Sequence, residues 1–334
     1  MHRISQKKSY RETSESVLEQ LGDVSYAKCD TFSSLRRILL SGDVVYSKNE
    51  LLDLLILQIA TSFRRPKIVV GIHTPIFYPY VGSRHARIHN WLYLGPIYRL
   101  LLAGVKLVIV HNEDDLHFCQ DKFPHIRTVK ILHGYKTGSG VLQLRDENRD
   151  THVLFVGRLV EPKGIDVFLD TVDIVNNSKL RDNISFRVAG DGEANLNDRV
   201  AGYQQKYLNF AYLGHVPNAA LNEQYGWADI VVIPSRYETL NQVALEAGAA
   251  GRVAIASDIP GPREVIIPGV TGYLFELNVN NVAKTLMRTI EMKSSEPEKF
   301  KLLGSNARKR IQDRFDPYRT AEQFFAAITE VGKR

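Results

Sequence analysis

The sequence predicts an α/β protein with two doubly wound, Rossmann-like domains, each built on a parallel sheet. Its 334 residues suit two domains of roughly 150 residues each. Short β-branched runs alternate with longer helical patterns along the chain, which is typical of βαβ units. The run Ile230–Ile233 is apolar throughout, as expected for a parallel strand buried on both faces.

The first half is expected to form a domain over residues 1–140. Its expected strands are 24–29, 43–46, 67–73, 106–111 and 128–132, with helices over 50–62 and 88–102. A polar stretch with several glycines and serines, 136–150, follows Gly134 and is the expected linker.

The second half repeats the alternation, so we expect a second domain over 150–315. Its expected strands are 152–156, 185–189, 211–213, 230–233 and 253–256, with helices over 165–176, 221–225, 240–250 and 282–291. A last helix, 318–331, follows Pro317, and the tail 316–334 is expected to pack back on the first domain. Ligands of such sheets bind beyond the carboxyl ends of the strands, here in the cleft expected between the domains.

Composition narrows the class of protein. Apolar residues make up 44% and charged residues 24%, as in ordinary globular proteins. No run of eighteen apolar residues appears, so no transmembrane helix is expected, and the polar start does not look like a secretory signal. Cys29 and Cys119 are too few for a disulfide framework or a cysteine zinc site. The expected location is the cytoplasm.

The net charge of +6 lies entirely in the first half, and no carboxylate occurs between Asp53 and Glu113. This stretch contains the cations Arg64, Arg65, Lys67, Arg84, Arg87, Arg99 and Lys106 and the aromatic residues Tyr78, Tyr80, Trp91, Tyr93 and Tyr98. One interpretation is a solvated basic face. The other is a surface for an anionic partner, and the aromatic residues then favour the inner face of a membrane. Nothing like a recognition helix accompanies the charge, so nucleic acid is not an expected partner.

Two segments carry the candidate chemistry. The first, 156–164, leaves a buried strand, turns at Gly157 and opens a helix, with Arg158 and Lys163 on either side of the turn. Backbone N–H groups and two cations suit a diphosphate there. The alternative interpretation is that Arg158 and Lys163 are merely two surface cations. The second segment runs from a buried strand into a helix with Glu238 before it and Glu246 inside it. Carboxylates suit sugar hydroxyls because each accepts several hydrogen bonds, although Glu238 is also a plausible helix-capping acid.

Residues 151–330 resemble the nucleotide-sugar-binding domain of glycosyltransferase family 4. The members of this family are retaining enzymes with the GT-B fold. The resemblance rests on six segments in this order: 156–164, Val188–Gly192, Leu213–Val216, 228–235, the Glu238 and Glu246 pair, and 257–264. In the first half, the strands and His73 follow the family's order, and the match there is weaker.

The resemblance implies a role for each matching residue. His73 would lie near the reacting sugar, Arg158 and Lys163 would hold the donor diphosphate, Glu238 would accept from the transferred sugar and Glu246 from the ribose. The remaining donor-binding residues would be Gly157, Gly190, Gly214, His215, Val216, Leu240, Asn241 and Gln242. The implied reaction needs no metal and no cofactor, only a nucleotide-diphosphate sugar as donor substrate and a glycan or lipid-linked acceptor.

Three departures from the family pattern stand out. Asn241 replaces a usual glycine, and its side chain is expected to narrow the sugar pocket or to add a hydrogen bond. His133 replaces a frequent asparagine and is interpreted as structural. The first strand and glycine-rich loop are not recognisable in Met1–Leu18. An alternative function therefore stays open, that of a non-catalytic or partner-dependent subunit of a transferase complex.

Overall fold

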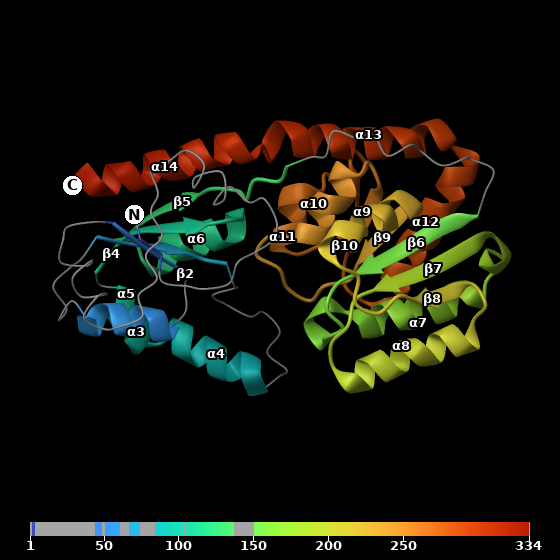
Figure 1. Ribbon diagram of the computed structural model, residues 1–334, viewed down its shortest axis with the longest axis horizontal. Coiled ribbons are helices and arrows are strands. Elements are labelled where there is room, and N and C mark those ends of the chain that lie inside the picture. The colour runs from blue at the N-terminus through green and yellow to red at the C-terminus, as the bar shows by residue number, and fades with distance from the viewer. Residues whose placement is uncertain are drawn as a thin grey trace. The chain divides into compact units, whose positions relative to one another are not determined.

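The computed structural model describes residues 2–3, 44–48, 51–60, 67–73, 84–102, 104–136 and 150–333 (Figure 1). The chain divides into two compact units. Unit 1 contains Met1–Lys136 together with Phe315–Arg334, and unit 2 is Thr137–Arg314. The expected strand 24–29 and most of the expected linker lie outside the described residues.

Unit 1 contains a five-stranded parallel sheet in the order β1-β2-β3-β4-β5. Its strands are β1 His2–Arg3, β2 Val45–Lys48, β3 Ile68–Gly71, β4 Val105–Val110 and β5 Arg127–Lys130. The helices are α3 Leu51–Ala60, α4 Arg84–Leu94, α5 Pro96–Leu102, α6 Glu113–Lys122 and α14 Pro317–Lys333. The predicted helix 88–102 is therefore two helices, because Gly95 and Pro96 interrupt it.

Strand residues of unit 1 alternate between two apolar layers. Val70 and Val108 pack with residues of α3, α5 and α6. Val69 and Ile109 point to the opposite face and pack with Ala321 and neighbouring residues of α14. Side chains along a strand alternate between faces, so helices cover the sheet on both sides. The last helix of the chain therefore belongs to the core of unit 1.

The start of the chain does form a strand. The backbone of His2 and Arg3 pairs in parallel with Val45 and Tyr46 at one margin of the sheet. The sequence offered no apolar run there, but ladder hydrogen bonds use backbone groups and do not require one. The expectation that the first strand is missing is therefore corrected for the strand, and not for the glycine-rich loop.

Unit 2 contains a six-stranded parallel sheet in the order β11-β10-β9-β6-β7-β8. Its strands are β6 Thr151–Val156, β7 Ile184–Ala189, β8 Phe210–Tyr212, β9 Ile230–Ile233, β10 Val253–Ser257 and β11 Gly272–Phe275. The helices are α7 Ile165–Asn176, α8 Ala194–Lys206, α9 Asn218–Trp227, α10 Gln242–Ala249, α11 Pro260–Val265, α12 Val279–Ser295 and α13 Pro297–Arg314. The strand order reverses between β6 and β9, which is the switch point where such sheets bind ligands.

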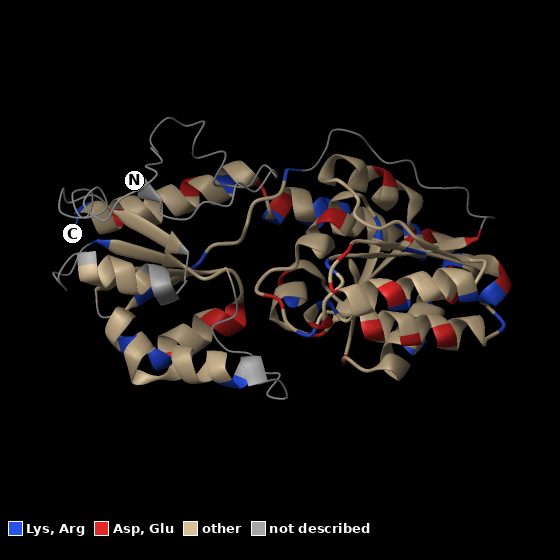
Figure 2. Ribbon diagram, turned by 60° about the horizontal axis from the view of Figure 1, so that its bottom comes forward, with Lys and Arg blue, Asp and Glu red and all other residues tan. Residues whose placement is uncertain are grey.

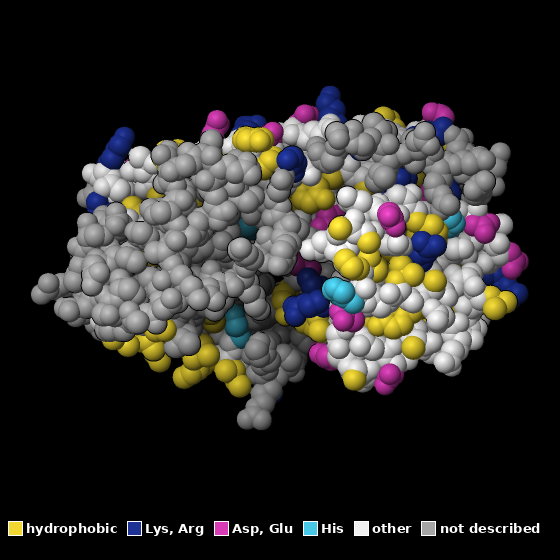
Figure 3. Space-filling view, viewed as in Figure 1, with side chains coloured by type: hydrophobic (Ala, Val, Ile, Leu, Met, Phe, Trp, Pro, Cys, Tyr) yellow, Lys and Arg dark blue, Asp and Glu magenta, His cyan; other side chains and the backbone are white. Residues whose placement is uncertain are grey.

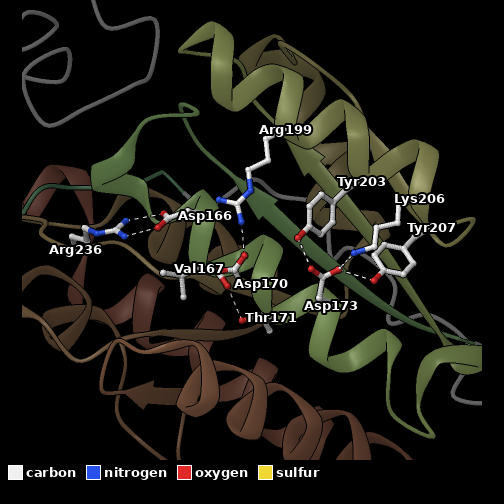
Figure 4. Close-up of polar contacts among 10 residues, drawn as sticks. All are labelled: Asp166, Val167, Asp170, Thr171, Asp173, Arg199, Tyr203, Lys206, Tyr207 and Arg236. Carbon is white, nitrogen blue, oxygen red and sulfur yellow. Dashed lines mark hydrogen bonds and ion pairs between the residues drawn. The ribbon is translucent and has the colours of Figure 1, made fainter.

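Helices α7 and α8 are joined by a set of polar contacts centred on Asp173 (Figure 4). Its carboxylate accepts hydrogen bonds from Tyr203 Oη at 2.7 Å, Lys206 Nζ at 2.7 Å and Tyr207 Oη at 2.6 Å. Burial alone would raise the pKa of Asp173, but these three donors lower it below its usual value. Because α8 has few apolar residues, much of its attachment to α7 is polar, and its sequence did not predict a helix.

Among the residues that the structure describes, no helix is long and apolar enough to cross a membrane.

Candidate functional site

The turn after β6 is held against the turn after β7 by backbone hydrogen bonds. Gly157 N donates to Ala189 O at 3.0 Å, and Leu159 N donates to Asp191 O at 2.8 Å. Gly190 has φ of 150°, and a Cβ there would lie 1.8 Å from Gly157 O. A side chain at Gly190 would push the two turns apart, so its predicted part in the site is to let them meet. Arg158 lies on this turn with an exposed side chain.

The turn continues through a short 3₁₀ segment, Glu161–Lys163, to Gly164. Gly164 has φ of 69°, and a Cβ there would lie 1.8 Å from Pro234 O in the loop after β9. The loops that follow two neighbouring strands therefore touch at this glycine. This contact brings the first predicted segment to the second.

Lys163 and Glu238 form an ion pair at that contact. Lys163 Nζ donates to Glu238 Oε1 at 2.5 Å, and Ser235 Oγ donates to the same oxygen at 3.0 Å. The Lys163 side chain is 30% exposed and that of Glu238 is 12% exposed. Glu238 lies in the loop before α10, as the sequence predicted, so it is not part of the helix. A cation for phosphate and a carboxylate for hydroxyls thus lie side by side.

The loop that carries Glu238 is fixed from two sides. Arg236 forms a bidentate ion pair with Asp166 of α7, at 2.9 Å and 2.6 Å (Figure 4). Burial alone would raise the pKa of Asp166, but the guanidinium lowers it. On the other side, Gly261 N donates to Glu238 O at 3.1 Å, and a Cβ at Gly261 would lie 2.8 Å from Glu238 Cβ. Arg236 and Asp166 are 70 residues apart, so no sequence pattern pointed to them.

Glu246 is buried inside α10, with 6% of its surface exposed. Tyr225 Oη of α9 donates to Glu246 Oε2 at 2.6 Å. The hydroxyl fixes the direction of the carboxylate, which a buried acid requires because an unsatisfied charge is costly to bury. Tyr225 was not singled out in the sequence, where it reads only as an apolar helix position.

Asn241 caps helix α10. Its side-chain Oδ1 accepts from Ala244 N at 2.8 Å, and the residue is buried. The side-chain oxygen is thus used by the helix, and the expected narrowing of a sugar pocket or added hydrogen bond by Asn241 stays a prediction. Asparagine is a preferred N-cap, and α10 accordingly starts at Gln242 rather than at Leu240.

The remaining predicted donor residues lie around these turns. Gly190 N donates to Gly214 O at 2.8 Å, which links the turns after β7 and β8. His215 is 73% exposed, and its Nδ1 is 3.6 Å from Asp191 Oδ1. Val216, Leu240 and Gln242 are half-buried.

A pocket of about 750 Å³ also occurs in unit 2, but at the amino end of β6. Its lining includes Asp150, Lys179 and Ile290, and none of the predicted site residues. The donor chemistry expected here needs glycine turns and paired charges at the carboxyl ends of strands, so we place the candidate site at the turns instead.

His73 belongs to unit 1, where it follows β3. Its Nε2 is 2.6 Å from Tyr46 Oη. Two further histidines, His111 after β4 and His133 after β5, lie beside it, with ring centroids 3.9 to 5.1 Å apart. His73 is thus one of three histidines at the carboxyl ends of neighbouring strands. Of the three, the sequence predicts a functional role for His73 alone, and His133 is interpreted there as structural.

Comparison with known proteins finds relatives of the sequence of unit 2. Residues 150–292 match the family model described as "Glycosyl transferases group 1". Glycogen synthase of Thermodesulfovibrio yellowstonii is 30% identical over 165 residues, which is 48% of this chain and 32% of the relative. Lipopolysaccharide 1,2-N-acetylglucosaminetransferase of Salmonella typhimurium is 34% identical over 140 residues, which is 39% of this chain and 36% of the relative. The chain therefore spans well under half the length of these relatives.

Among solved structures, Anabaena Alr3699/HepE in complex with UDP-glucose superposes with a TM-score of 0.72. It is 16% identical, and the superposition covers 98% of this chain and 99% of that one. Likeness at such low identity speaks for the fold alone. The fold is the GT-B type, with Rossmann-like units on parallel sheets.

Proposed function

We propose that the chain is a retaining glycosyltransferase that moves a sugar from a nucleotide-diphosphate sugar to a glycan or lipid-linked acceptor. The observation that carries the proposal is the contact between Lys163 and Glu238 where the loops after β6 and β9 meet. It puts a phosphate-binding cation beside a hydroxyl-binding carboxylate. The family match over 150–292 supports the reaction class, and the bound UDP-glucose of the Anabaena protein supports the donor class.

In the proposed mechanism, donor binding exchanges the partners of Lys163. Its ammonium moves from Glu238 to the diphosphate, and the carboxylate then accepts hydrogen bonds from hydroxyls of the transferred sugar. Arg158, exposed on the neighbouring turn, supplies the second cation. As the anomeric bond breaks, these two cations stabilise the charge that develops on the leaving phosphate. The proposal assigns this task to the two side chains rather than to a metal ion.

Glu246 and Tyr225 are proposed to recognise the ribose. The tyrosine hydroxyl fixes the direction of the carboxylate, and a carboxylate accepts several hydrogen bonds, which suits a pair of neighbouring hydroxyls. His73 is proposed to contact the reacting sugar from unit 1. The acceptor oxygen bonds to the anomeric carbon on the face from which the phosphate leaves, and the leaving phosphate takes the acceptor proton. No protein nucleophile is required on this path.

The proposed acceptor is presented by an anionic membrane surface, which unit 1 contacts through α3, α4 and α5. These helices expose a group of apolar side chains: Leu55, Ile59, Ile88, Trp91, Leu94, Ile97 and Leu100. Trp91 is 69% exposed, and Arg87 and Arg99 are exposed on the same helices. Neither α4 nor α5 contains an acidic residue (Figure 2). Figure 3 shows hydrophobic side chains along the margin where Figure 1 labels α3 and α4.

Exposed aromatic and aliphatic side chains beside arginines are typical of interfacial membrane binding. Flotation with vesicles rich in anionic lipid at low salt tests this surface. We expect binding that weakens with salt and with Trp91→Ala, whereas Phe325→Ala on α14 serves as an exposed apolar control. Failure to float at low salt would remove the membrane from the proposal.

The donor is tested by thermal unfolding with UDP-, GDP- and ADP-sugars, since a bound donor raises the unfolding temperature. Transfer is then measured with the stabilising donor, and Glu238→Ala should abolish it while the far-UV spectrum is unchanged. Glu291→Ala, an exposed acid on α12, is the matched control. If the parent releases no nucleotide unless a partner chain is added, the chain is a partner-dependent subunit instead. Undiminished turnover by the Glu238 variant would refute the assignment.

A further inference from the structure

A cluster of three histidines occupies the carboxyl ends of β3, β4 and β5 in unit 1. The cluster consists of His73, His111 and His133. Each ring offers one nitrogen atom, and these three nitrogen atoms lie within 4.8 Å of one another. We propose that these side chains form a binding site for a borderline divalent transition ion such as Zn²⁺. The proposal concerns residues of unit 1, and it shares His73 with the proposed transferase site.

The sheet brings the three residues together. The register pairs Gly71 with Ile109 and Val110 with Lys130, so the residues that follow these strands continue side by side. Neighbouring strands are about 4.8 Å apart, which leaves successive strand ends within reach of one ion. The side chains alternate along the strands, and the histidines continue the face that carries Val69 and Ile109.

Hydrogen bonds hold two of the rings in defined directions. His111 Nδ1 is 2.7 Å from the carbonyl oxygen of Ile131, to which only an N–H can donate. The ligating atom of His111 is therefore Nε2. His73 Nε2 is 2.6 Å from Tyr46 Oη, so its ligating atom is Nδ1. Metal-binding histidines almost always hydrogen-bond through the second ring nitrogen in this way, which orients the ring and raises its basicity.

The residue types select the ion. Imidazole nitrogens suit zinc, copper and nickel, whereas magnesium and calcium require oxygen ligands. The free thiol among the described residues, Cys119, is buried, and burial raises its pKa to about 12, so it does not supply a thiolate. Three histidines with one open position are a known zinc arrangement.

Metal binding requires a small movement of the side chains. Zinc–nitrogen distances of about 2.0–2.1 Å in a tetrahedron put ligand nitrogens roughly 3.4 Å apart, so the separation of up to 4.8 Å must shorten. His111 is buried and acts as the fixed ligand, while His73 and His133 are half-buried and can rotate toward it. The fourth position is left for water or another small ligand.

Cobalt spectroscopy tests the site without any donor or acceptor. The full chain is stripped with a chelator and titrated with Co²⁺ alone, which gives intense visible absorption bands in a tetrahedral site. We expect saturation at about one equivalent and displacement by Zn²⁺, as for a single built site. His133→Ala should abolish the bands, and Tyr46→Phe should weaken binding by about 10–100-fold, the usual cost of losing an orienting partner.

His125→Ala is the matched control, because His125 is an exposed histidine of the same unit. It should leave the titration unchanged. His73→Ala is the second ligand variant, in case His133→Ala does not fold, and far-UV spectra report folding. The proposal is overturned if the parent gives no saturable bands, if the bands survive both ligand variants, or if near-ultraviolet absorption shows thiolate ligation instead.

Discussion

The carboxyl ends of the two sheets carry different chemistry on similar backbones. In unit 2, glycine turns bring Lys163 against Glu238. An ion pair between an arginine and an aspartate fixes the loop that carries Glu238. In unit 1, the corresponding positions carry three imidazoles in ring contact. Charged groups recognise phosphates and hydroxyls, whereas neutral imidazoles recognise soft cations or exchange protons. The parallel sheet fixes where side chains meet, and the residues that follow the strands decide what they bind.

After the loss of Glu238, the largest expected effect is the loss of the cation in unit 2. Lys163→Ala should lower kcat by about 10²–10³-fold, because a group aimed at the developing charge of the leaving phosphate is lost. Initial rates with the stabilising donor measure it. Lys284→Ala removes an exposed lysine of α12 and should leave the rate unchanged. Equal rates for the two variants would show that the charge at the Lys163 turn takes no part in transfer.

A smaller effect is expected at the buried carboxylate of unit 2. Tyr225→Phe removes the hydroxyl that orients Glu246. A hydrogen bond to a charged group is worth about 1.5–3 kcal/mol, so the KM for the donor should rise about 10–100-fold while kcat changes little. Tyr318→Phe, at an exposed tyrosine of α14, is the control. A fall in kcat at constant KM would instead place Tyr225 in the chemical step.

One aspartate in each unit should make the free energy of unfolding depend on pH, and the two dependences should have opposite signs. The first is Asp115 of unit 1. Burial raises the pKa of Asp115 on α6 to about 6, against the hydrogen bond from Asn112, which lowers it. The folded state therefore binds the proton more tightly than the unfolded state, and stability is lost as pH rises from about 4 to about 6. Asp115→Asn should raise the free energy of unfolding at pH 7.5 by up to about 3 kcal/mol.

Urea unfolding at pH 7.5 and pH 4 measures this gain, which should shrink toward zero at pH 4. Asp121→Asn is the control on the same helix, since Asp121 is exposed and its pKa is lowered by Lys122. A gain that is equal at both pH values would show that ionisation of Asp115 is not its cause.

In unit 2, Asp173 should give a pH dependence of stability with the opposite sign. Because its pKa is lowered in the folded state, its contribution is complete at neutral pH and is lost as pH falls through the folded pKa. Asp173→Asn should cost about 1 kcal/mol at pH 7 and flatten the acid limb of the stability profile. Asp182→Asn, at an exposed acid in the same unit, should do neither. An unchanged acid limb in the Asp173 variant would contradict this assignment.

Much of unit 2 could be predicted because its strands are largely apolar and three of them, β6, β7 and β9, are followed directly by glycine or proline. The predicted helix 165–176 is α7 in full, and Glu238 lies in the predicted loop. Contacts between distant residues could not be predicted. Arg236 meets Asp166 and Tyr225 meets Glu246 only because strands β6 and β9 are neighbours and helices α9 and α10 pack, which residue spacing does not encode.

The histidine cluster of unit 1 could not be predicted from the sequence either. Each of its three histidines follows a strand that the sequence predicts, yet a single histidine is usually structural, and only the sheet register reveals the cluster. Helix α13, Pro297–Arg314, was missed because half of its length is polar. The helix-capping role of Asn241 was not predicted either.

The position of α14 in unit 1 has a consequence for synthesis on the ribosome. The helix supplies Ala321, Phe324 and Ile328 to one face of the first sheet, yet about 180 residues separate it from Lys136. At 5–20 residues per second, roughly ten to forty seconds pass between the emergence of those two parts. Unit 2 is contiguous, and its last residue, Arg314, emerges before α14 does. The half of the protein that is made first is therefore finished last, and its exposed sheet face is what a chaperone would meet in the meantime.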